Sequence, residues 1–173
     1  MKFIKNIAVV LLICSCASVR VDYDFDRKTD FSEYKTYNYY SDLETGLTAL
    51  DSKRLLNVFD DVMNAKGLSL SESPDFYVNI QSSEYESHQQ NTVGVGIGGS
   101  GRNVGGGISV GIPLDQSKMS RQIIFDFIDE DGKGLFWQAV SESSYNMNVS
   151  PDQREANLRA IVEKVLNGYP PNQ

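Results

Sequence analysis

The sequence predicts a single α+β domain, with a mainly antiparallel sheet of about five to seven strands and two amphipathic helices packed on one face of that sheet. Short runs in which apolar and polar residues alternate recur along the chain, as in strands with one buried face. Two longer segments, 51–66 and 151–167, repeat apolar residues every three or four positions, as amphipathic helices do. Asp131-Gly132 lies between two alternating runs and predicts a hairpin.

The first residues of the chain form a short positive segment followed by an apolar run. Lys2 and Lys5 precede residues 7–13, which carry no charge. This order is typical of a secretory signal, and the run is too short to span a bilayer as a permanent helix.

The apolar run ends in Leu12-Ile13-Cys14-Ser15-Cys16, which resembles the lipobox of bacterial lipoproteins. Cys16 follows a small residue, whereas Cys14 follows Ile13 and is the poorer acceptor. We therefore expect residues 1–15 to be a cleaved signal peptide and residues 16–173 to be one lipid-anchored domain. An ordinary signal peptide and a signal anchor are the alternatives.

Lipidation has consequences for location and stability. Cys16 would carry a covalent diacylglycerol and an N-acyl chain, and we expect no other cofactor. Ala17 stands where sorting like that of Gram-negative lipoproteins would require Asp for retention in the inner membrane. We expect an outer-membrane protein on the periplasmic face, with exposure at the cell surface left open. Since both cysteines are removed or lipidated, the fold must be stable without a disulfide.

Charge and residue types argue against two kinds of partner. The chain has 16 Lys and Arg against 23 Asp and Glu, so it is a poor partner for nucleic acid. His88 is the only histidine and no cysteine lies outside the N-terminal segment, which argues against zinc. The acidic residues Asp22, Asp24, Asp26 and Asp30 are expected to project from an extended strand, without the glycine that a calcium loop needs at its sharp turn. We expect no metal site.

The first half of the domain is predicted to contain three strands and a helix. Residues 18–25 alternate, a turn with Phe31 and Tyr34 leads to a second strand, and Phe76, Val78 and Ile80 alternate in a third. In the second strand Tyr37 and Tyr39 share a face, which indicates packing rather than a carbohydrate platform. Either Thr48 or Asp51 caps the helix, and Gly67 ends it. The expected buried stripe of this helix is Leu55, Phe59, Val62 and Met63.

A polar stretch, 82–91, separates the third strand from a glycine-rich segment, 92–113. Nine glycines fall between Gly94 and Gly111. Around them Val93, Val95 and Ile97, and then Ile108, Val110 and Ile112, keep strict alternation. Gly94–Gly99 matches G-x-G-x-x-G, but no helix follows to bind a pyrophosphate. The segment is interpreted as a β-hairpin or a flexible loop. Its candidate partner-binding residues, in a flap or at a sheet edge, are Val93, Val95, Ile97, Ile108 and Val110.

The second half is predicted to contain a hairpin and a helix. Ile123, Phe125 and Phe127 share one face of the first strand, and the return strand, 134–142, is expected to bury Leu135, Trp137 and Ala139 together. Ser150, Pro151 and Gln153 form a capping box at the start of the last helix. The buried stripe expected there is Leu158, Ile161, Val162 and Val165, and Gly168 ends the helix.

A set of short motifs in this order resembles one known family. The motifs are Val21-Asp22-Tyr23-Asp24, Asp30-Phe31, Tyr34-Lys35-Thr36-Tyr37, Ala65-Lys66-Gly67-Leu68, Pro74-Asp75-Phe76, Trp137 and Tyr169-Pro170-Pro171. Across roughly residues 18–171 the chain resembles the domain-of-unknown-function 4136 lipoproteins of Gram-negative bacteria. It departs at Ala139, where the family tends to have glycine, and at Tyr169, where phenylalanine is usual. The resemblance implies an envelope lipoprotein without established catalytic residues.

The expected function is therefore not enzymatic. We expect a lipoprotein that binds or scaffolds a protein partner in the cell envelope through a sheet edge or the glycine-rich segment. The alternative is a carrier or sensor that holds a lipid or cell-wall fragment against the aromatic residues. A hydrolase is the weakest candidate, because the carboxylates are expected on surfaces, no G-x-S-x-G occurs, and His88 is expected in a polar loop.

Overall fold

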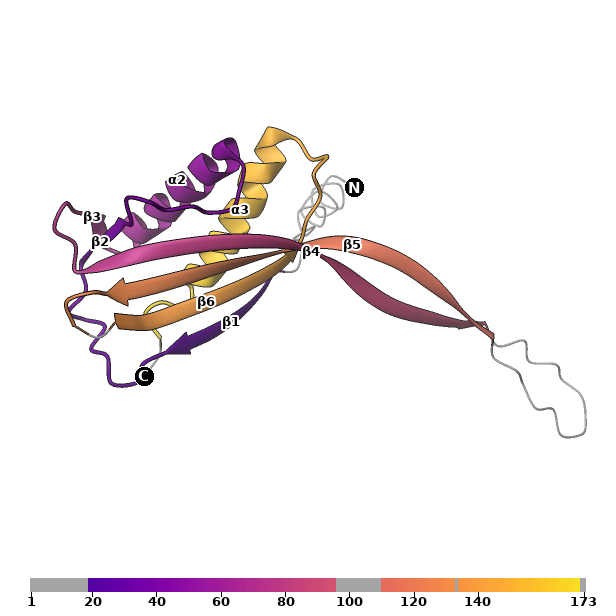
Figure 1. Ribbon diagram of the computed structural model, residues 1–173, viewed down its shortest axis with the longest axis horizontal. Helices are drawn as coiled ribbons and strands as arrows, with labels where there is room; N and C mark the ends of the chain where they lie inside the picture. The colour runs from indigo at the N-terminus through magenta and orange to yellow at the C-terminus, as the bar shows by residue number, and fades with distance from the viewer. Residues whose placement is uncertain (1–18, 96–109, 133, 172–173) are drawn as a thin grey trace, which may run out of the picture.

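The computed structural model describes residues 19–95, 110–132 and 134–171. In chain order the elements are β1 (Arg20–Phe25), β2 (Thr36–Tyr39), α2 (Ala49–Ala65), β3 (Ser69–Leu70), β4 (Phe76–Val95), β5 (Val110–Asp129), β6 (Gly134–Ser144) and α3 (Pro151–Leu166). The six strands form one open sheet in the order β1-β6-β5-β4-β2-β3. Both helices lie on the same side of this sheet (Figure 1), so the α+β architecture is confirmed.

The sheet is mixed, so the expectation of a mainly antiparallel sheet is met only in part. The three pairings among β1, β6, β5 and β4 are antiparallel, but β2 pairs in parallel with both β4 and β3. The cause is α2, which follows β2 and crosses over the sheet, so that the chain returns in the direction of β2. Alternation within a strand carries no information about its direction, and the expectation was wrong for this half of the sheet.

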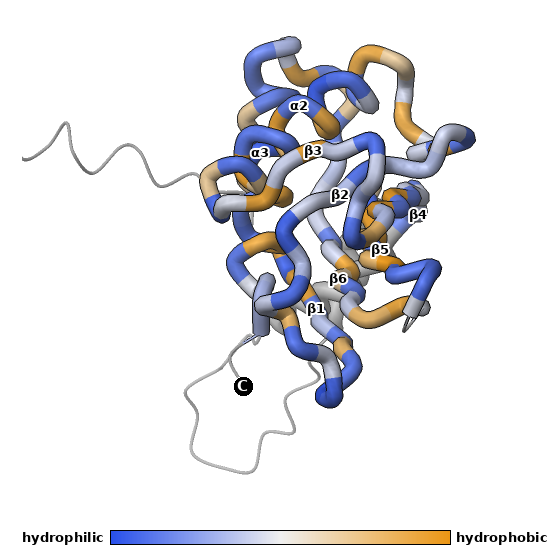
Figure 2. The backbone as a smooth tube through the Cα atoms, turned by 90° about the vertical axis from the view of Figure 1, so that its left-hand side faces the viewer, coloured by the Kyte–Doolittle hydropathy of each residue, from blue (hydrophilic) through white to orange (hydrophobic). Residues whose placement is uncertain are grey.

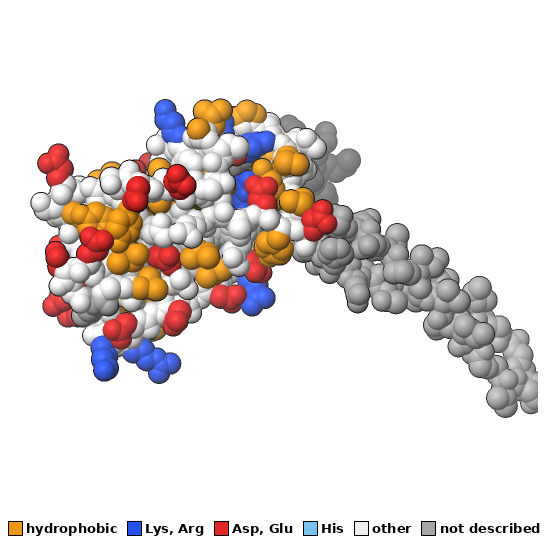
Figure 3. Space-filling model, in the orientation of Figure 1, with side chains coloured by type: hydrophobic (Ala, Val, Ile, Leu, Met, Phe, Trp, Pro, Cys, Tyr) orange, Lys and Arg blue, Asp and Glu red, His pale blue; other side chains and the backbone are white. Residues whose placement is uncertain are grey.

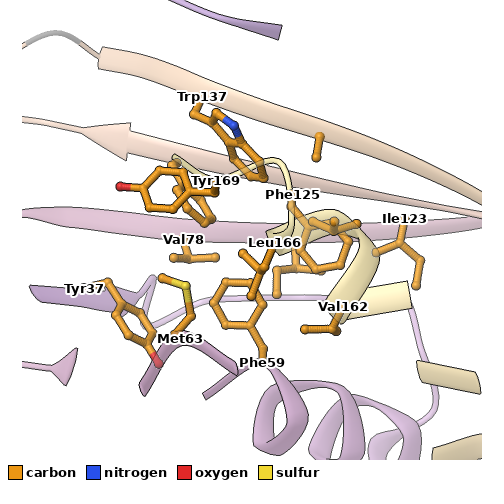
Figure 4. Close-up of a cluster of buried hydrophobic side chains, with 14 of the residues drawn as sticks. Tyr37, Phe59, Met63, Val78, Ile123, Phe125, Trp137, Val162, Leu166 and Tyr169 are labelled. Atoms are coloured by element: carbon orange, nitrogen blue, oxygen red, sulfur yellow. The ribbon is translucent and has the colours of Figure 1, made fainter. Parts of the chain in front are cut away.

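The core lies between the sheet and the two helices. Figure 2 shows hydrophobic segments in both layers, and Figure 4 shows their side chains pointing into the space between them. Of the stripe expected on α2, Leu55, Phe59 and Met63 are buried while Val62 is half-buried. Val58 is buried as well, so the buried stripe of α2 differs by one residue from the expected one. All four residues expected on α3 are buried.

The ends of the helices show which of the capping alternatives applies. Thr48 is the N-cap of α2, because its hydroxyl oxygen accepts from the Asp51 N–H at 3.3 Å. At α3 the Ser150 hydroxyl accepts from the Gln153 N–H at 3.2 Å, but the Gln153 side chain donates to Asn157 instead of closing the capping box. Gly67 follows α2 with φ +85°, the left-handed conformation expected of it.

A β-bulge changes the predicted face of β6. Phe127 pairs with Trp137 and Ile128 with Leu135, so Phe136 is the extra residue. Phe136 and Trp137 are consequently both buried, while Leu135 is 51% exposed. The expectation that Leu135 shares the face of Trp137 and Ala139 was wrong, because the bulge reverses the alternation at this point.

In the part of the chain that the structure describes, no helix is long and apolar enough to cross a membrane.

Candidate functional site

The central strands β4 and β5 are much longer than their neighbours. Each has 20 residues, and they stay paired in one register from Tyr77 with Ile128 to Val95 with Val110. The strand β6 pairs with β5 no further than Ser120. The remainder is a two-stranded ribbon, Glu86–Val95 with Val110–Met119, which we call the arm; the rest of the described chain is the body. At about 3.4 Å per residue the arm is about 30 Å long, and it projects away from the body (Figure 1).

The arm corrects the interpretation of the polar stretch 82–91. This stretch is not a loop: it continues β4, and His88 lies within the strand opposite Ser117. No helix in the described part of the chain covers this two-stranded ribbon, so its residues need not alternate between apolar and polar types. The main-chain ladder between the two strands forms without that pattern, which is why sequence periodicity did not reveal it.

The predicted partner-binding residues fall partly within the arm. Val93 pairs with Ile112, and Val95 pairs with Val110, at the distal end of the ribbon. Ile97 and Ile108 lie outside the described residues, as do the predicted signal peptide and Cys16.

Two hydrogen bonds mark where the neighbouring chain stops covering the edges of the central strands. The Ser82 N–H donates to the Thr45 carbonyl at 2.8 Å, and the Tyr145 N–H donates to the Met119 carbonyl at 2.8 Å. Beyond these points, no strand within the described ranges pairs with the outer edge of β4 or of β5. The arm therefore presents two edges with main-chain groups free to pair.

The same two hydrogen bonds show which residues face each edge. The N–H and C=O of one strand residue point to the same side, and the side alternates along the strand. The main-chain N–H of Ser82 points away from β5. The main-chain groups of the even-numbered residues of β4 therefore face the outer edge of β4. The main-chain carbonyl of Met119 points away from β4. The main-chain groups of the odd-numbered residues of β5, including Pro113, therefore face the outer edge of β5. Pro113 has no N–H, so the edge of β5 lacks a donor there.

A compact polar cluster lies where the arm joins the body. The guanidinium of Arg121 donates to Glu84 Oε1 at 2.7 Å, directly across the β4–β5 pair. Its Cζ lies 3.6 Å from the centre of the Tyr145 ring, at the end of β6. The Arg121 side chain is only 8% exposed. These contacts fix the point at which the two strands leave the sheet.

Next to this cluster Asp51 is buried, although we expected the carboxylates at the surface. Arg54 donates to Asp51 at 2.7 Å, and Arg154 of α3 donates to it at 3.0 Å. Burial tends to raise the pKa of Asp51, but the two guanidinium groups outweigh it and lower the pKa below its ordinary value. The adjoining cavity, between α3 and the segment after β6, measures about 30 Å³. It has room for little more than a water molecule, so this ion cluster joins the two helices rather than forming a substrate pocket.

The aromatic residues form the interior of the body. Tyr37 is fully buried, and its hydroxyl and that of Tyr39 each donate to Asp60 Oδ1 at 2.7 Å. Their interpretation as packing residues is confirmed. Further rings join the cluster: Phe31, Tyr34, Phe59, Phe76, Phe125, Phe127, Phe136, Trp137 and Tyr169.

One aromatic pair lies at the surface instead. Tyr40 and Tyr77 stack with ring centroids 5.0 Å apart, and Tyr40 borders an open hollow of about 510 Å³ that also contains Asp42 and Glu44. Burial raises the pKa of Tyr40 to about 12, with a further contribution from a hydrogen bond to Glu130. Figure 3 shows hydrophobic side chains in separate groups among acidic ones on the face that it presents.

Sequence reasoning expected a sheet edge for partner binding but did not locate the two open edges of the arm, and it missed the Arg121 cluster. Pro113 was the available signal, since proline within an alternating run marks an edge strand. Nothing in the sequence pairs Arg121 with Glu84, because the register of two strands so far apart in the chain is not visible in either one.

Comparisons with known proteins agree with this fold. The sequence profile of the family described as "Domain of unknown function (DUF4136)" matches residues 21–171. No curated protein sequence matches significantly. A crystal structure of a DUF4136 family protein from Bacteroides thetaiotaomicron is similar, with TM-score 0.53 and 12% identity over 88% of this chain and 96% of that one.

Two other solved structures are similar at low identity. One is a PDZ domain protein from Parabacteroides distasonis, with TM-score 0.56 and 13% identity; the match covers 96% of this chain but only 40% of that one. The other is the PelC dodecamer from Paraburkholderia phytofirmans, with TM-score 0.53 and 9% identity over 90% of this chain and 100% of that one. At these identities the likeness concerns the fold alone.

Proposed function

The chain belongs to the DUF4136 family, and from this premise we propose that it is a lipoprotein, anchored through Cys16 at the periplasmic face of the outer membrane, which binds an envelope protein through its arm. The arm receives a strand of that partner. In this proposal the protein has no catalytic role, no metal and no nucleic-acid partner, and its only bound group is the acyl modification of Cys16.

The observation that carries the proposal is the uncovered outer edge of β4. Beyond Ser82, the even-numbered residues from Glu86 to Thr92 direct their N–H and C=O groups away from β5. An extended segment of another protein gains main-chain hydrogen bonds by pairing there, and such strand addition is a common mode of peptide recognition. We assign the partner strand to β4 rather than β5 because Pro113 removes a donor from the edge of β5.

The partner is another envelope protein or a second copy of this chain. The PelC structure to which the chain is similar is a dodecamer. Pairing between copies of this chain is therefore tested in the same experiment as binding to another protein. Two β4 edges pairing around a two-fold axis would satisfy each other, because antiparallel edges are self-complementary.

The test is photocrosslinking in intact cells, with the reactive residue at Val95 or Val110 of the full lipidated protein. Mass spectrometry of the adducts identifies the partner, and adducts between two copies of this chain identify self-pairing. Expression of the signal and anchor alone is the background control. Absence of any protein adduct from both positions would contradict the proposal.

Two proline substitutions distinguish the edges. Gln90→Pro removes an outward N–H from β4, and Ser117→Pro removes one from β5, while neither interrupts the ladder between the two strands. We expect Gln90→Pro to lower the yield of the partner adduct about tenfold, the effect of losing roughly one hydrogen bond. Ser117→Pro should leave the yield unchanged. Equal losses from both variants would contradict the assignment to β4.

A carrier or sensor would have to bind its lipid or glycan outside the aromatic cluster. The aromatic cluster is interior, so a lipid or glycan would have to bind at the hollow beside Tyr40 and Tyr77. A photoreactive residue at Asp42 tests this alternative. Lipid or glycan adducts from Asp42, together with none to protein from the arm, would replace the partner hypothesis by the carrier hypothesis.

A further inference from the structure

The hollow beside Tyr40 lies where the loop after β2 meets the uncovered face of the sheet. It measures about 510 Å³, the size of common small-molecule sites, and is lined by Tyr40, Asp42, Leu43, Glu44, Asn79 and Gln81. Val78 and Ile80 of β4 are buried against the helices. The residues that alternate with them, Asn79 and Gln81, therefore point to the opposite face, which no helix of the described residues covers (Figure 1).

The loop that forms one wall of the hollow is fixed to β4. The Ser82 N–H donates to the Thr45 carbonyl at 2.8 Å, and the hydroxyls of Thr45 and Ser52 share a hydrogen bond of 2.6 Å. Gly46 has φ +72°, and a Cβ at this position would lie 2.6 Å from the carbonyl oxygen of Ser82. Glycine thus allows the loop to approach the strand this closely. The hollow is preformed, so a ligand does not have to order the loop.

The polar side chains of the hollow are available to a ligand. Within the described residues, no group hydrogen-bonds to the side chains of Glu44, Asn79 or Gln81. The neighbouring polar pair on the same face differs, since Asp126 accepts from Gln138 at 2.7 Å. Each free carboxamide offers two N–H donors and a carbonyl acceptor, and a carboxylate accepts. The hollow can therefore satisfy a ligand that both donates and accepts hydrogen bonds.

Tyr40 supplies a flat apolar surface beside these groups. Its ring stacks on that of Tyr77, with centroids 5.0 Å apart and an interplanar angle of 23°, and its hydroxyl is hydrogen-bonded to Glu130. The orientation of the Tyr40 ring is thus fixed at both its face and its hydroxyl. The face of an aromatic ring carries partial negative charge and attracts polarised C–H groups, such as those on one face of a pyranose ring.

The composition of the lining excludes other classes of ligand. Asp42 and Glu44 are acidic, and no Lys or Arg is among the described residues that line the hollow. A phosphate or a carboxylate would meet negative charge without a compensating cation there. Leu43 is the one aliphatic residue of this described lining, which is too little to cover an acyl chain. A neutral ring with many hydroxyl groups matches the aromatic surface, the amides and the carboxylates together.

We propose that the hollow binds a neutral saccharide, with a pyranose ring on the face of Tyr40 and its hydroxyl groups bonded to the amides and carboxylates of the lining. The hollow is separate from the arm, so this inference goes beyond the proposed protein partner and does not depend on it. Two sources offer the same chemistry: chains of N-acetylated sugars, and polymers of unmodified hexoses.

The test is isothermal titration calorimetry of the full lipidated protein in phospholipid nanodiscs, which contain no sugar. The probes are the tetramer of N-acetylglucosamine and cellotetraose, and we expect at least one to bind. Tyr40→Ala should weaken the affinity about tenfold through loss of the stacking surface. Gln81→Ala should weaken it about threefold to tenfold through loss of a hydrogen bond. The matched control is Tyr85→Ala, which removes an exposed tyrosine from the same face of β4 outside the hollow and should leave the affinity unchanged.

The outcomes separate the possible results. Binding of neither tetrasaccharide overturns the proposal, as does an equal loss from Tyr40→Ala and Tyr85→Ala. If Tyr40→Ala fails to fold, the effect of Gln81→Ala decides, because this exposed side chain has no partner in the described chain.

A lysine tetrapeptide provides the charged comparison. Its binding in place of the sugars would make the hollow a site for basic peptides and would overturn the proposal. Saccharide binding should persist at high salt, since the ligand carries no charge. In cells, glycan adducts from a photoreactive residue at Asp42 are expected whether or not the arm yields protein adducts, so the two proposals fail separately.

Discussion

The body and the arm are built from the same two strands but are stabilised in different ways. In the body, Phe76, Val78 and Ile80 of β4 are buried against the helices, opposite Phe127 and Phe125 of β5. In the arm no helix of the described residues covers the continuing strands, and the two strands are paired along their main chains. Core packing supplies most of the stability of a fold, whereas an isolated two-stranded ribbon is only marginally stable in water. Substitutions in the body should therefore alter stability, and substitutions in the arm should alter binding.

The largest effect is expected in the aromatic interior. Phe127 is fully buried and contacts Trp137, Tyr169 and Phe76 at ring-centroid distances of 4.5, 4.9 and 5.0 Å. Phe127→Ala should lower the free energy of unfolding by about 3–5 kcal/mol, through lost burial and the cavity left behind. Urea unfolding followed by tryptophan fluorescence measures this. A loss below about 1 kcal/mol would show that the body does not depend on this cluster.

A smaller loss is expected at the buried carboxylate between the helices. Asp51→Asn keeps the shape but removes the charge that Arg54 and Arg154 hold, and should cost about 2–3 kcal/mol at neutral pH. Because the folded pKa of Asp51 is lowered, its contribution is present above the ordinary Asp pKa and is lost as the pH falls through the folded value. The stability difference between wild type and variant should accordingly shrink on acidification. A difference that stays constant with pH would contradict the assignment.

At the junction of body and arm the effect should be modest and local. Arg121→Lys keeps the charge but loses the planar contact with Tyr145, which should cost about 1 kcal/mol. Hydrogen exchange should accelerate for amides near Met119 and Glu84 and stay unchanged in α3. Exchange that accelerates throughout the body would show that Arg121 supports the whole fold rather than the base of the arm.

The smallest effect is expected within the arm itself. Gln89 and Gln116 pair across the ribbon, away from the core. Replacing both with Ala should change the free energy of unfolding by less than about 0.5 kcal/mol, as for substitutions outside packed regions. Gln138→Ala with Asp126→Ala, a second cross-strand pair but within the body, provides the comparison, since it removes a 2.7 Å hydrogen bond. Equal losses at the two sites would contradict the separation of roles.

The parts of the fold predicted from the sequence are those in which one face is buried. The helix from Pro151 and the run Ile123, Phe125 and Phe127 have the required periodicity, because each packs one side against the core. The direction of a strand and its register with its neighbour do not change the residue pattern within that strand. For this reason the parallel pairing of β2 and the bulge at Phe136 were not predicted.

For the candidate site, the sequence indicated the distal residues but not their setting. Val93, Val95 and Val110 were selected by their alternation with glycine, and the structure places them in one ribbon. That this ribbon continues the central strands was not predictable, since the stretch between Ser82 and Asn91 lacks the apolar period by which strands are recognised. The buried Asp51 was missed for a related reason: its partner Arg154 lies about a hundred residues away in sequence.

The proline at position 113 also bears on stoichiometry. A ribbon that accepts a strand at each edge is bivalent, and bivalent units that add to one another grow into open-ended fibres. Because Pro113 removes a donor from the edge of β5, the proposed strand addition uses the edge of β4 alone. When the β4 edges of two copies pair with each other, neither edge is left for a third strand. In the proposed strand pairing, Pro113 would limit each copy to one partner strand, and copies anchored side by side on a membrane would then not polymerise through their arms.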